Sequence, residues 1–278
     1  VLLPTRVGVS DEDEAASTVR DLRDEAVDFV KLRTVPSRPV YEAILREAAE
    51  AGLTVAGHEP LVVPLAEASE LGQRSIEHLP FLSVADLEEP ERRELFDDFA
   101  RNDTWVVPTL VAWKAYRLTP DSVASRAIEQ LRMAPRRKRP YISEGLLDFW
   151  EMQIAIKALE SPMDWQGLME RGTADLRLMR ECGVGLMAGS DLSLPLLEPG
   201  RSLHEELALM VEEGGLSPLE AIECATLAPA IFFGLSDSLG TVEEGKVADL
   251  VLLDADPLRD ISNTRAIAAV ISGGRVVQ

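Results

Sequence analysis

The segments LTVAGH (53–58), QRSIEH (73–78) and GVGLMAGSD (183–191) decide the fold, because each is a short apolar run that ends in a polar side chain. An amphipathic, helix-like stretch precedes each of them and closes on glycine. Helices that end on glycine and pass quickly to a strand are typical of α/β units. Near-continuous apolar strands indicate a parallel sheet that is covered on both faces. The sequence therefore predicts an α/β fold built on a parallel sheet.

The same unit recurs elsewhere in the chain. EAASTVRDLRDEAVDFVKL (14–32) fits it, and so does PERRELFDDFARN (90–102) followed by TWVVPTL (104–110). Five strands are thus expected, with ends that carry Lys31, His58, His78, Thr109 and Asp191. A closed (β/α)8 barrel needs eight strands, so the pattern predicts part of such a barrel.

The strand ends carry metal-ligating side chains. Carboxyl ends of parallel barrel strands meet at one mouth, where His58, His78 and Asp191 would converge. Imidazole and carboxylate suit divalent ions such as Zn²⁺, so we expect one or two divalent ions, with Zn²⁺ as the first choice. Glu59 and Glu77 flank the histidines, and strand alternation would turn them away from the barrel interior into a supporting or structural role.

The remaining segments do not follow this helix–strand pattern. Residues from about 114 to 172 are helical and polar, and they form either an insertion that covers the mouth or a plain outer helical layer. Helices are expected at 202–214 and 217–234. Strands with turns at EEGK and SGG follow within 240–258 and 266–278. About three strands cannot bury a sheet face alone, so partner strands from elsewhere are expected.

Composition narrows the classes of partner. The chain has 278 residues and a formal net charge of −20, which argues against nucleic acid and anionic membranes. No apolar run is long enough for a membrane span, and the sequence contains no GxSxG, P-loop or GxGxxG motif. The two cysteines lack CxxC spacing and are expected as buried thiols. A small-molecule substrate is the expected partner, while localisation and a homo-oligomeric state stay open.

Five segments together resemble the amidohydrolase superfamily, in particular its imidazolonepropionase-like and Xaa-Pro-dipeptidase-like members. They are GHEP (57–60), AEASELGQRSIEHL (66–79), MAGSD (187–191), SLHEELALMVEEGGLSPLEAIECATLAPA (202–230) and the tail DSLGTVEEGKVADLVLLDADPLRDISNTRAIAAVISGGRVV (237–277). The likeness covers nearly the whole chain except 114–172. It implies a (β/α)8 barrel with a small β-sandwich made from both chain termini.

The resemblance also implies roles for single residues. His58 and His78, ending barrel strands 5 and 6, would be metal ligands. Asp191, ending strand 8, would be a ligand and the catalytic acid/base. Lys31, ending strand 4, stands where many relatives carry a carboxylated lysine that bridges two metals. His204 would shape the substrate side of the pocket.

The implied organisation is a partial barrel, strands 4–8, in residues 1–235 with a helical insert at about 114–172. Residues 236–278 would then be the C-terminal part of the composite β-sandwich. The family's His-x-His pair, which ends strand 1, has no match among the three histidines of this chain. We therefore expect strands 1–3 and the N-terminal half of the sandwich to be missing, and weak or no activity from this chain alone.

These features predict a metal-dependent hydrolase that cleaves carbon–nitrogen bonds of an amide, a dipeptide or a cyclic amide through a metal-activated water. Two alternatives stay open. One is a catalytically incompetent amidohydrolase fragment with a binding or assembly role. The other is a phosphotriesterase-like hydrolase, which would share the ligands.

Overall fold

The computed structural model describes residues 7–118, 122–139, 141–157, 164–192 and 194–277. The chain divides into two compact units. Unit 1 comprises Val1–Val107 and Leu178–Leu186, and unit 2 comprises Pro108–Arg177 and Met187–Gln278. This division does not fall at residue 235, so the expected barrel and sandwich domains stay a prediction.

Unit 1 is built on a parallel sheet in the order β1-β2-β3-β4. Its strands are β1 (Phe29–Leu32), β2 (Thr54–Gly57), β3 (Gln73–Glu77) and β4 (Trp105–Val107). Each strand falls in a segment where the apolar runs predicted one. The expectation of an α/β fold with a parallel sheet is confirmed.

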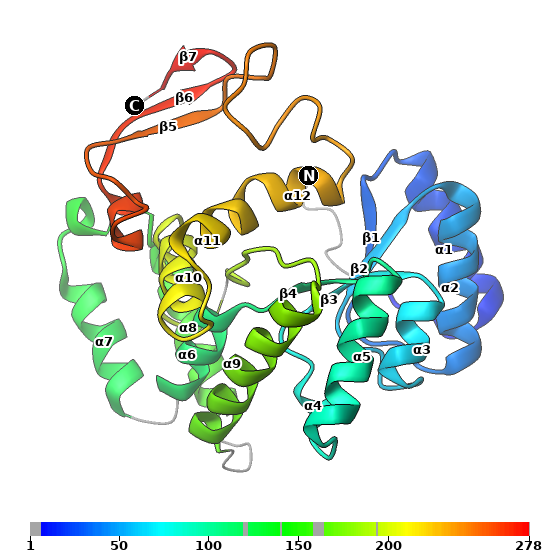
Figure 1. Cartoon of the computed structure of the whole chain (residues 1–278). Helices are drawn as coiled ribbons and strands as arrows, with labels where there is room; N and C mark the ends of the chain where they lie inside the picture. Colours follow the sequence, from blue (N-terminus) through cyan, green and yellow to red (C-terminus); the bar gives the residue numbers. More distant parts are fainter. Residues whose placement is uncertain (1–6, 119–121, 140, 158–163, 193, 278) are drawn as a thin grey trace. The chain divides into compact units, whose positions relative to one another are not determined.

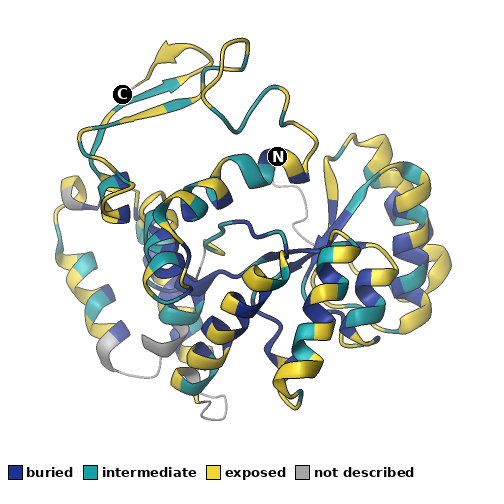
Figure 2. Ribbon diagram, viewed as in Figure 1, coloured by how far each residue is buried: buried dark blue, intermediate teal, exposed yellow. Residues whose placement is uncertain are grey.

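Helices connect these strands and gather on one side of the sheet (Figure 1). They are α1 (Glu12–Asp24), α2 (Arg38–Ala51), α3 (Leu65–Glu70), α4 (Phe81–Val84) and α5 (Glu89–Arg101). Helix α2 ends where predicted, because Gly52 adopts a left-handed conformation with φ +71°. Buried residues concentrate along the strands and on the helix faces turned toward them (Figure 2).

The predicted strand within 183–191 is much shorter than expected. Only Leu186 pairs, in a single parallel bridge with Val106, and the Val106 N–H donates to the Gly185 carbonyl at 2.9 Å. Strand β4, with which this segment would pair, is itself short. Strand β4 stops at Val107, since Pro108 has no N–H to donate. A regular strand from 184 to 191 is therefore a wrong prediction.

Unit 2 is mainly helical. Its helices are α6 (Leu110–Leu118), α7 (Ser122–Met133), η1 (Arg136–Lys138), α8 (Glu144–Lys157), α9 (Trp165–Cys182, which reaches into unit 1), α10 (Arg201–Glu212), α11 (Pro218–Ala225), α12 (Leu227–Phe232) and η2 (Ile261–Arg265). The prediction that residues 114–172 are helical is confirmed for the residues that the structure describes.

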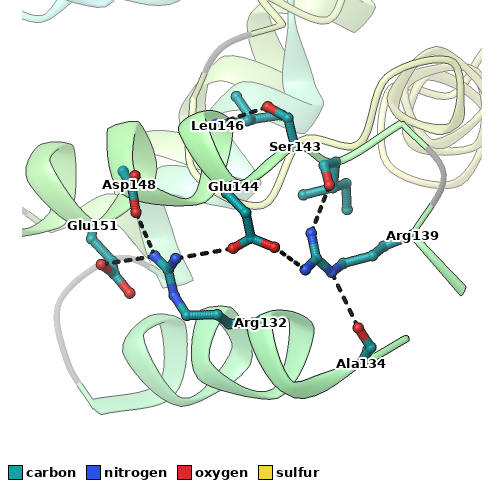
Figure 3. A network of polar contacts seen from close by, with 9 residues as sticks. Arg132, Ala134, Arg139, Ser143, Glu144, Leu146, Asp148 and Glu151 are labelled. Atoms are coloured by element: carbon teal, nitrogen blue, oxygen red, sulfur yellow. Dashed lines mark hydrogen bonds and ion pairs between the residues drawn. The ribbon is translucent and has the colours of Figure 1, made fainter. Parts of the chain in front are cut away.

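Helices α7 and α8 pack into a hairpin with its own core. Ile128, Leu147 and Trp150 are fully buried in this core, and Leu196 from the segment after Asp191 packs against it. Two guanidinium groups flank the Glu144 carboxylate (Figure 3). One belongs to Arg139, the last residue of the basic RRKR run, whose side chain is 3% exposed. Part of this basic run therefore has a structural function.

The helix expected over 217–234 is broken in two. It starts with a capping box, in which Ser217 accepts from the Glu220 N–H and Glu220 from the Ser217 N–H. Helix α11 ends at Thr226, which has φ −131°, and α12 begins with Leu227. Pro229 is the cause, because it has no N–H for the carbonyl four residues earlier.

Three antiparallel strands end the chain, in the order β5 (Leu250–Leu253), β6 (Ile267–Ser272) and β7 (Arg275–Val276). Every residue of these strands is exposed or half-buried (Figure 2). This agrees with the expectation that so small a sheet buries no face of its own. Across the described part of the chain, no helix has the length and apolar character to cross a membrane.

Candidate metal centre

His58 and His78 stand one residue beyond β2 and β3. The His58 N–H donates to the Leu32 carbonyl at 3.0 Å, and the His78 N–H donates to the Val107 carbonyl at 2.8 Å. These bonds continue the ladder past the strand ends. The two imidazoles are therefore held at the same carboxyl edge of the parallel sheet, as strand order predicted.

The two rings meet at their Nε2 atoms, which lie 3.3 Å apart. The ring centroids are 4.8 Å apart and the planes cross at 65°. Two imidazole nitrogens bound about 2.05 Å from one tetrahedral ion would lie about 3.3 Å from each other. The pair thus fits two neighbouring corners of a zinc-like site. No group of three or more His, Cys, Asp or Glu suited to a metal occurs among the described residues.

Three predicted strand-end residues have left-handed backbone conformations. The φ angles are +69° at His78, +49° at Thr109 and +48° at Asp191. Such angles are uncommon outside glycine, and for β-branched Thr109 the conformation is a clear outlier. Strained positions persist where the surrounding structure holds them, and they cluster at functional sites.

Gly57 holds β2 close to β1 immediately before His58. Its φ is +153°, and a Cβ added there would lie 2.2 Å from the Leu32 carbonyl oxygen. No side chain fits that space without moving the Leu32 backbone. The position of His58 therefore depends on a glycine directly before it.

Lys31 is paired with Glu77 rather than standing alone. Its Nζ lies 3.8 Å from Glu77 Oε2, and the Ser75 hydroxyl donates to Glu77 Oε1 at 2.9 Å. Strand register places Lys31, Ala56 and Ser75 on one face, and Glu77 follows Ser75 by two residues on that same face. Glu77 therefore contacts Lys31 and Ser75, and the expectation that it points away from the barrel interior in a supporting or structural role stays a prediction.

Glu59 has the structural role that was expected of it. Its carboxylate accepts from the backbone N–H groups of Leu82 at 3.2 Å and Ser83 at 3.0 Å. These residues belong to the first turn of α4, so Glu59 satisfies N–H groups that the short helix leaves open.

Asp191 and His204 belong to unit 2. Asp191 is exposed in the segment after the Leu186 bridge. His204, on α10, has its Nδ1 3.1 Å from the Thr264 hydroxyl, which itself donates to the Ile261 carbonyl at 2.9 Å. The hydroxyl oxygen therefore accepts a hydrogen bond from the Nδ1–H group of His204. Burial, with Arg265 nearby, lowers the pKa of His204. This contact ties α10 to η2, and the substrate role of His204 stays a prediction.

Sequence reasoning missed a buried carboxylate on α10. Glu206 is fully buried and accepts from the N–H groups of Leu110 at 2.9 Å and Val111 at 2.7 Å, at the start of α6. Burial raises the pKa of Glu206 to about 8, although both N–H donors act in the opposite direction. The signal was present in the sequence, since Glu206 lies on the same helix stripe as Ser202, Leu209 and Met210, all of which are buried.

Sequence reasoning also missed the polar pair Tyr41 and Gln73. Both side chains are fully buried, and the Tyr41 hydroxyl donates to Gln73 Oε1 at 2.8 Å. The run QRSIEH shows a polar residue at its start, but no sequence pattern indicates which face that residue occupies.

Comparison with known proteins identifies the class. Residues 11–277 match the amidohydrolase family, which is nearly the whole chain. The chain belongs to this family, and the resemblance drawn from its motifs is confirmed. Members of the family are typically metal-dependent.

Individual relatives agree with this assignment. Ochratoxinase of Aspergillus niger is 35% identical over 100 residues, covering 34% of this chain and 20% of its own length. Imidazolonepropionase of Thermoplasma volcanium is 33% identical over 93 residues, covering 34% of this chain and 22% of its own length. The matched stretches thus span about a fifth of these relatives.

Solved structures match over the full chain. Bottromycin amidohydrolase superposes with a TM-score of 0.70 at 26% identity, covering 100% of this chain and 62% of that one. A Xaa-Pro dipeptidase with bound methionine in its active site gives 0.69 at 23% identity, covering 97% and 59%. The chain therefore spans about three fifths of these proteins, and the likeness to the dipeptidase concerns the fold alone.

Proposed function

We propose that this chain carries part of the active site of a metal-dependent hydrolase that cleaves the carbon–nitrogen bond of an amide, a dipeptide or a cyclic amide. The observation that supports it best is the 3.3 Å approach of His58 Nε2 and His78 Nε2 at neighbouring strand ends. A second support is membership of the amidohydrolase family. We further propose that β1 to β4 are strands 4 to 7 of a (β/α)8 barrel and that the segment at the Leu186 bridge takes the place of strand 8.

In this proposal His58 and His78 hold a divalent ion, with Zn²⁺ the first choice because two neutral imidazoles suit it. When bound, such an ion supplies Lewis acidity, which polarises a carbonyl and lowers the pKa of a water. Asp191 completes the ligand set and accepts the proton of the attacking water. It then passes this proton to the departing nitrogen as the carbon–nitrogen bond breaks, which balances the hydrolysis.

Lys31 has a role in this proposal only if a second metal ion binds. Its pairing with Glu77 at 3.8 Å suits a lysine ammonium. Carboxylation would give it a negative charge close to the Glu77 carboxylate, and like charges at this distance repel. A cation between them would offset that repulsion. A ¹³C NMR spectrum recorded at neutral pH with ¹³C-labelled bicarbonate should therefore show a carbamate signal, absent from Lys31→Ala, only in the presence of added Zn²⁺.

Metal binding by the 278-residue chain is the first test. Titration with Zn²⁺, using a chromophoric competitor, should show a site that His58→Ala and His78→Ala each abolish. The matched control is His204→Ala, the same substitution at the third histidine, whose ring contacts Thr264. It should keep the wild-type metal stoichiometry. Equal losses in all three variants would indicate unspecific histidine binding and contradict the proposal.

The substrate class needs a separate test. Because weak or no activity is expected from these 278 residues alone, this test uses the intact enzyme. We expect a panel of N-acyl amino acids, dipeptides and cyclic amides to contain its substrate, with amine release as the readout. A phosphotriester belongs in the same panel, because a phosphotriesterase-like hydrolase would share the ligands. Turnover of the phosphotriester without any amide hydrolysis would overturn the proposed bond specificity.

A binding or assembly role is the second candidate. It is favoured by one observation, namely that the described residues bring two imidazoles together but no third ligand of the His, Cys, Asp or Glu type. Catalytic zinc sites have three protein ligands. Metal binding by the intact protein without hydrolysis of any panel member would favour this second candidate.

A further inference from the structure

Gln73 connects three backbone carbonyls beneath the histidine pair. Its side chain is fully buried at the first position of β3. The Nε2 group donates to the carbonyl oxygens of Gly57 at 3.2 Å, His58 at 3.0 Å and Ser75 at 3.1 Å. Since Nε2 has two hydrogens for three acceptors, one hydrogen is shared.

Tyr41 fixes the orientation of this amide. Its hydroxyl donates to Gln73 Oε1 at 2.8 Å, from a side chain on α2 that is fully buried. Burial raises the pKa of Tyr41, so the phenol remains a donor. The reversed amide would point its oxygen at three carbonyl oxygens, which disfavours it strongly. Both polar ends of Gln73 are thus satisfied in one orientation only.

An irregularity in the strand register places Gln73 where it can do this. Val55 pairs with Gln73, but Ala56 pairs with Ser75, so Arg74 is an extra residue in β3. Consecutive residues of β2 face opposite sides of the sheet, and so must their partners Gln73 and Ser75. A bulge of this kind re-aims a side chain. It puts Gln73 on the opposite face from Ser75 and within reach of Tyr41.

The backbone of His58 is consequently held from both neighbouring strands. Its N–H donates to Leu32 of β1 at 3.0 Å, and its carbonyl accepts from Gln73 of β3 at 3.0 Å. The residue before it, Gly57, is packed against Leu32 without room for a Cβ. Little freedom remains in the backbone from which the imidazole projects.

We propose that Gln73, oriented by Tyr41, is a positioning residue that sets the His58 imidazole against His78 for shared metal binding. This inference rests on the proposed metal function. It does not make Gln73 a ligand, because the partners of its amide among the described residues are backbone carbonyls and the Tyr41 hydroxyl. Groups that orient metal ligands from outside typically change metal affinity by about 10- to 100-fold.

The direct test is the Zn²⁺ affinity of Gln73→Leu in the 278-residue chain, measured under conditions where the variant is fully folded. We expect affinity to fall by about tenfold or more. The control is Ile44→Val, which truncates a buried apolar side chain on the same helix as Tyr41. It should leave metal affinity unchanged. Unchanged affinity in Gln73→Leu would overturn the positioning role and leave the metal proposal intact.

A double variant separates positioning from stability. Gln73→Leu alone leaves the buried Tyr41 hydroxyl without its acceptor, whereas Tyr41→Phe combined with Gln73→Leu removes both polar groups. The double variant should regain part of the lost thermal stability, while its Zn²⁺ affinity stays as low as in Gln73→Leu. Recovery of affinity together with stability would show that Gln73 acts only through stability and would overturn the proposal.

Hydrogen exchange in metal-free protein gives a readout that needs no ion. The His58 amide donates to Leu32, so its exchange reports on how firmly this residue is held. We expect faster exchange at His58 in Gln73→Leu than in Ile44→Val at matched stability. If wild-type protein binds no metal, the metal function fails, and exchange still decides whether Gln73 positions His58. Equal exchange in both variants would overturn the positioning role.

Discussion

The Nε2 atoms of His58 and His78 lie 3.3 Å apart, although the two residues are 20 positions apart in the chain. The segment between them forms one α/β unit, in which α3 carries the chain from the end of β2 to the start of β3. Parallel pairing of β2 with β3 therefore brings the two imidazoles together at one sheet edge. Two ring nitrogens at this separation match two ligands of one tetrahedral ion.

Gly57→Ala should destabilise the protein strongly and weaken metal binding. Its Cβ would lie 2.2 Å from the Leu32 carbonyl oxygen, so β1 and β2 would have to separate. We expect a loss of about 3 kcal/mol or more in the free energy of unfolding. Gly52→Ala is the control, because Gly52 also has a positive φ but nothing lies within 4 Å of its Cβ. It should lose only about 1–2 kcal/mol in urea unfolding. Equal losses in both variants would contradict the close approach.

In the intact enzyme, Asp191→Asn should retain the fold while kcat on the substrate identified by the panel falls by about 10²- to 10⁴-fold. The amide keeps the size of the carboxylate but cannot accept and release a proton at neutral pH. Steady-state kinetics would measure this, with KM and thermal stability recorded beside kcat. Asp237→Asn, at an exposed position of the tail, serves as the control for loss of one negative charge. Near-normal kcat in Asp191→Asn would remove this residue from proton transfer.

Glu206 should make stability fall with rising pH between about pH 5 and 8. Its pKa is raised from the ordinary 4.5 to about 8 in the folded protein, so the folded state binds more protons than the unfolded state in this window. Stability then decreases with pH, by at most about 1.4 kcal/mol per unit from this group, and levels off above pH 8.

Urea unfolding across this pH range checks the sign. Glu206→Gln resembles the protonated side chain and should lose this slope relative to wild type. Glu205→Gln changes the partly exposed neighbour, which pairs with Arg201, and should keep the slope. A slope that survives in Glu206→Gln would assign the pH dependence to other groups.

Arg139→Ala should loosen the α7–α8 hairpin. The guanidinium is buried, donates to the Ile142 carbonyl at 2.8 Å, and pairs with Glu144. Its removal leaves these acceptors unsatisfied, and we expect a loss of about 1–3 kcal/mol. Hydrogen exchange should accelerate across α7 and α8. Arg137→Ala removes an exposed charge from the same basic run and should change little. Similar exchange in the two variants would show that Arg139 is dispensable.

Hydrophobic pattern and helix stops predicted most of unit 1. Apolar runs after glycine-terminated helices correctly located β2 and β3, the same helix–strand pattern located β1, and strand order explained why His58 and His78 meet. The pattern failed near 183–191, where an apolar run resembles a strand although only Leu186 pairs. Periodicity measures burial, and a buried extended segment need not be hydrogen-bonded into a ladder.

Other features depend on tertiary context that no local pattern contains. The bulge at Arg74 that turns Gln73 toward Tyr41 is a property of the pairing between two strands. The Lys31–Glu77 pair requires the register across three strands. Pro229 did signal the break between α11 and α12, and attention to its missing N–H would have predicted it.

Shared metal binding by His58 and His78 can be seen in an anomalous-scattering map at the zinc edge from a crystal of this chain grown with Zn²⁺. We expect one peak about 2.0–2.1 Å from both His58 Nε2 and His78 Nε2. A zinc peak at this distance from only one of the two nitrogens would contradict shared metal binding. So would a zinc peak elsewhere in the protein with the two Nε2 atoms still 3.3 Å apart.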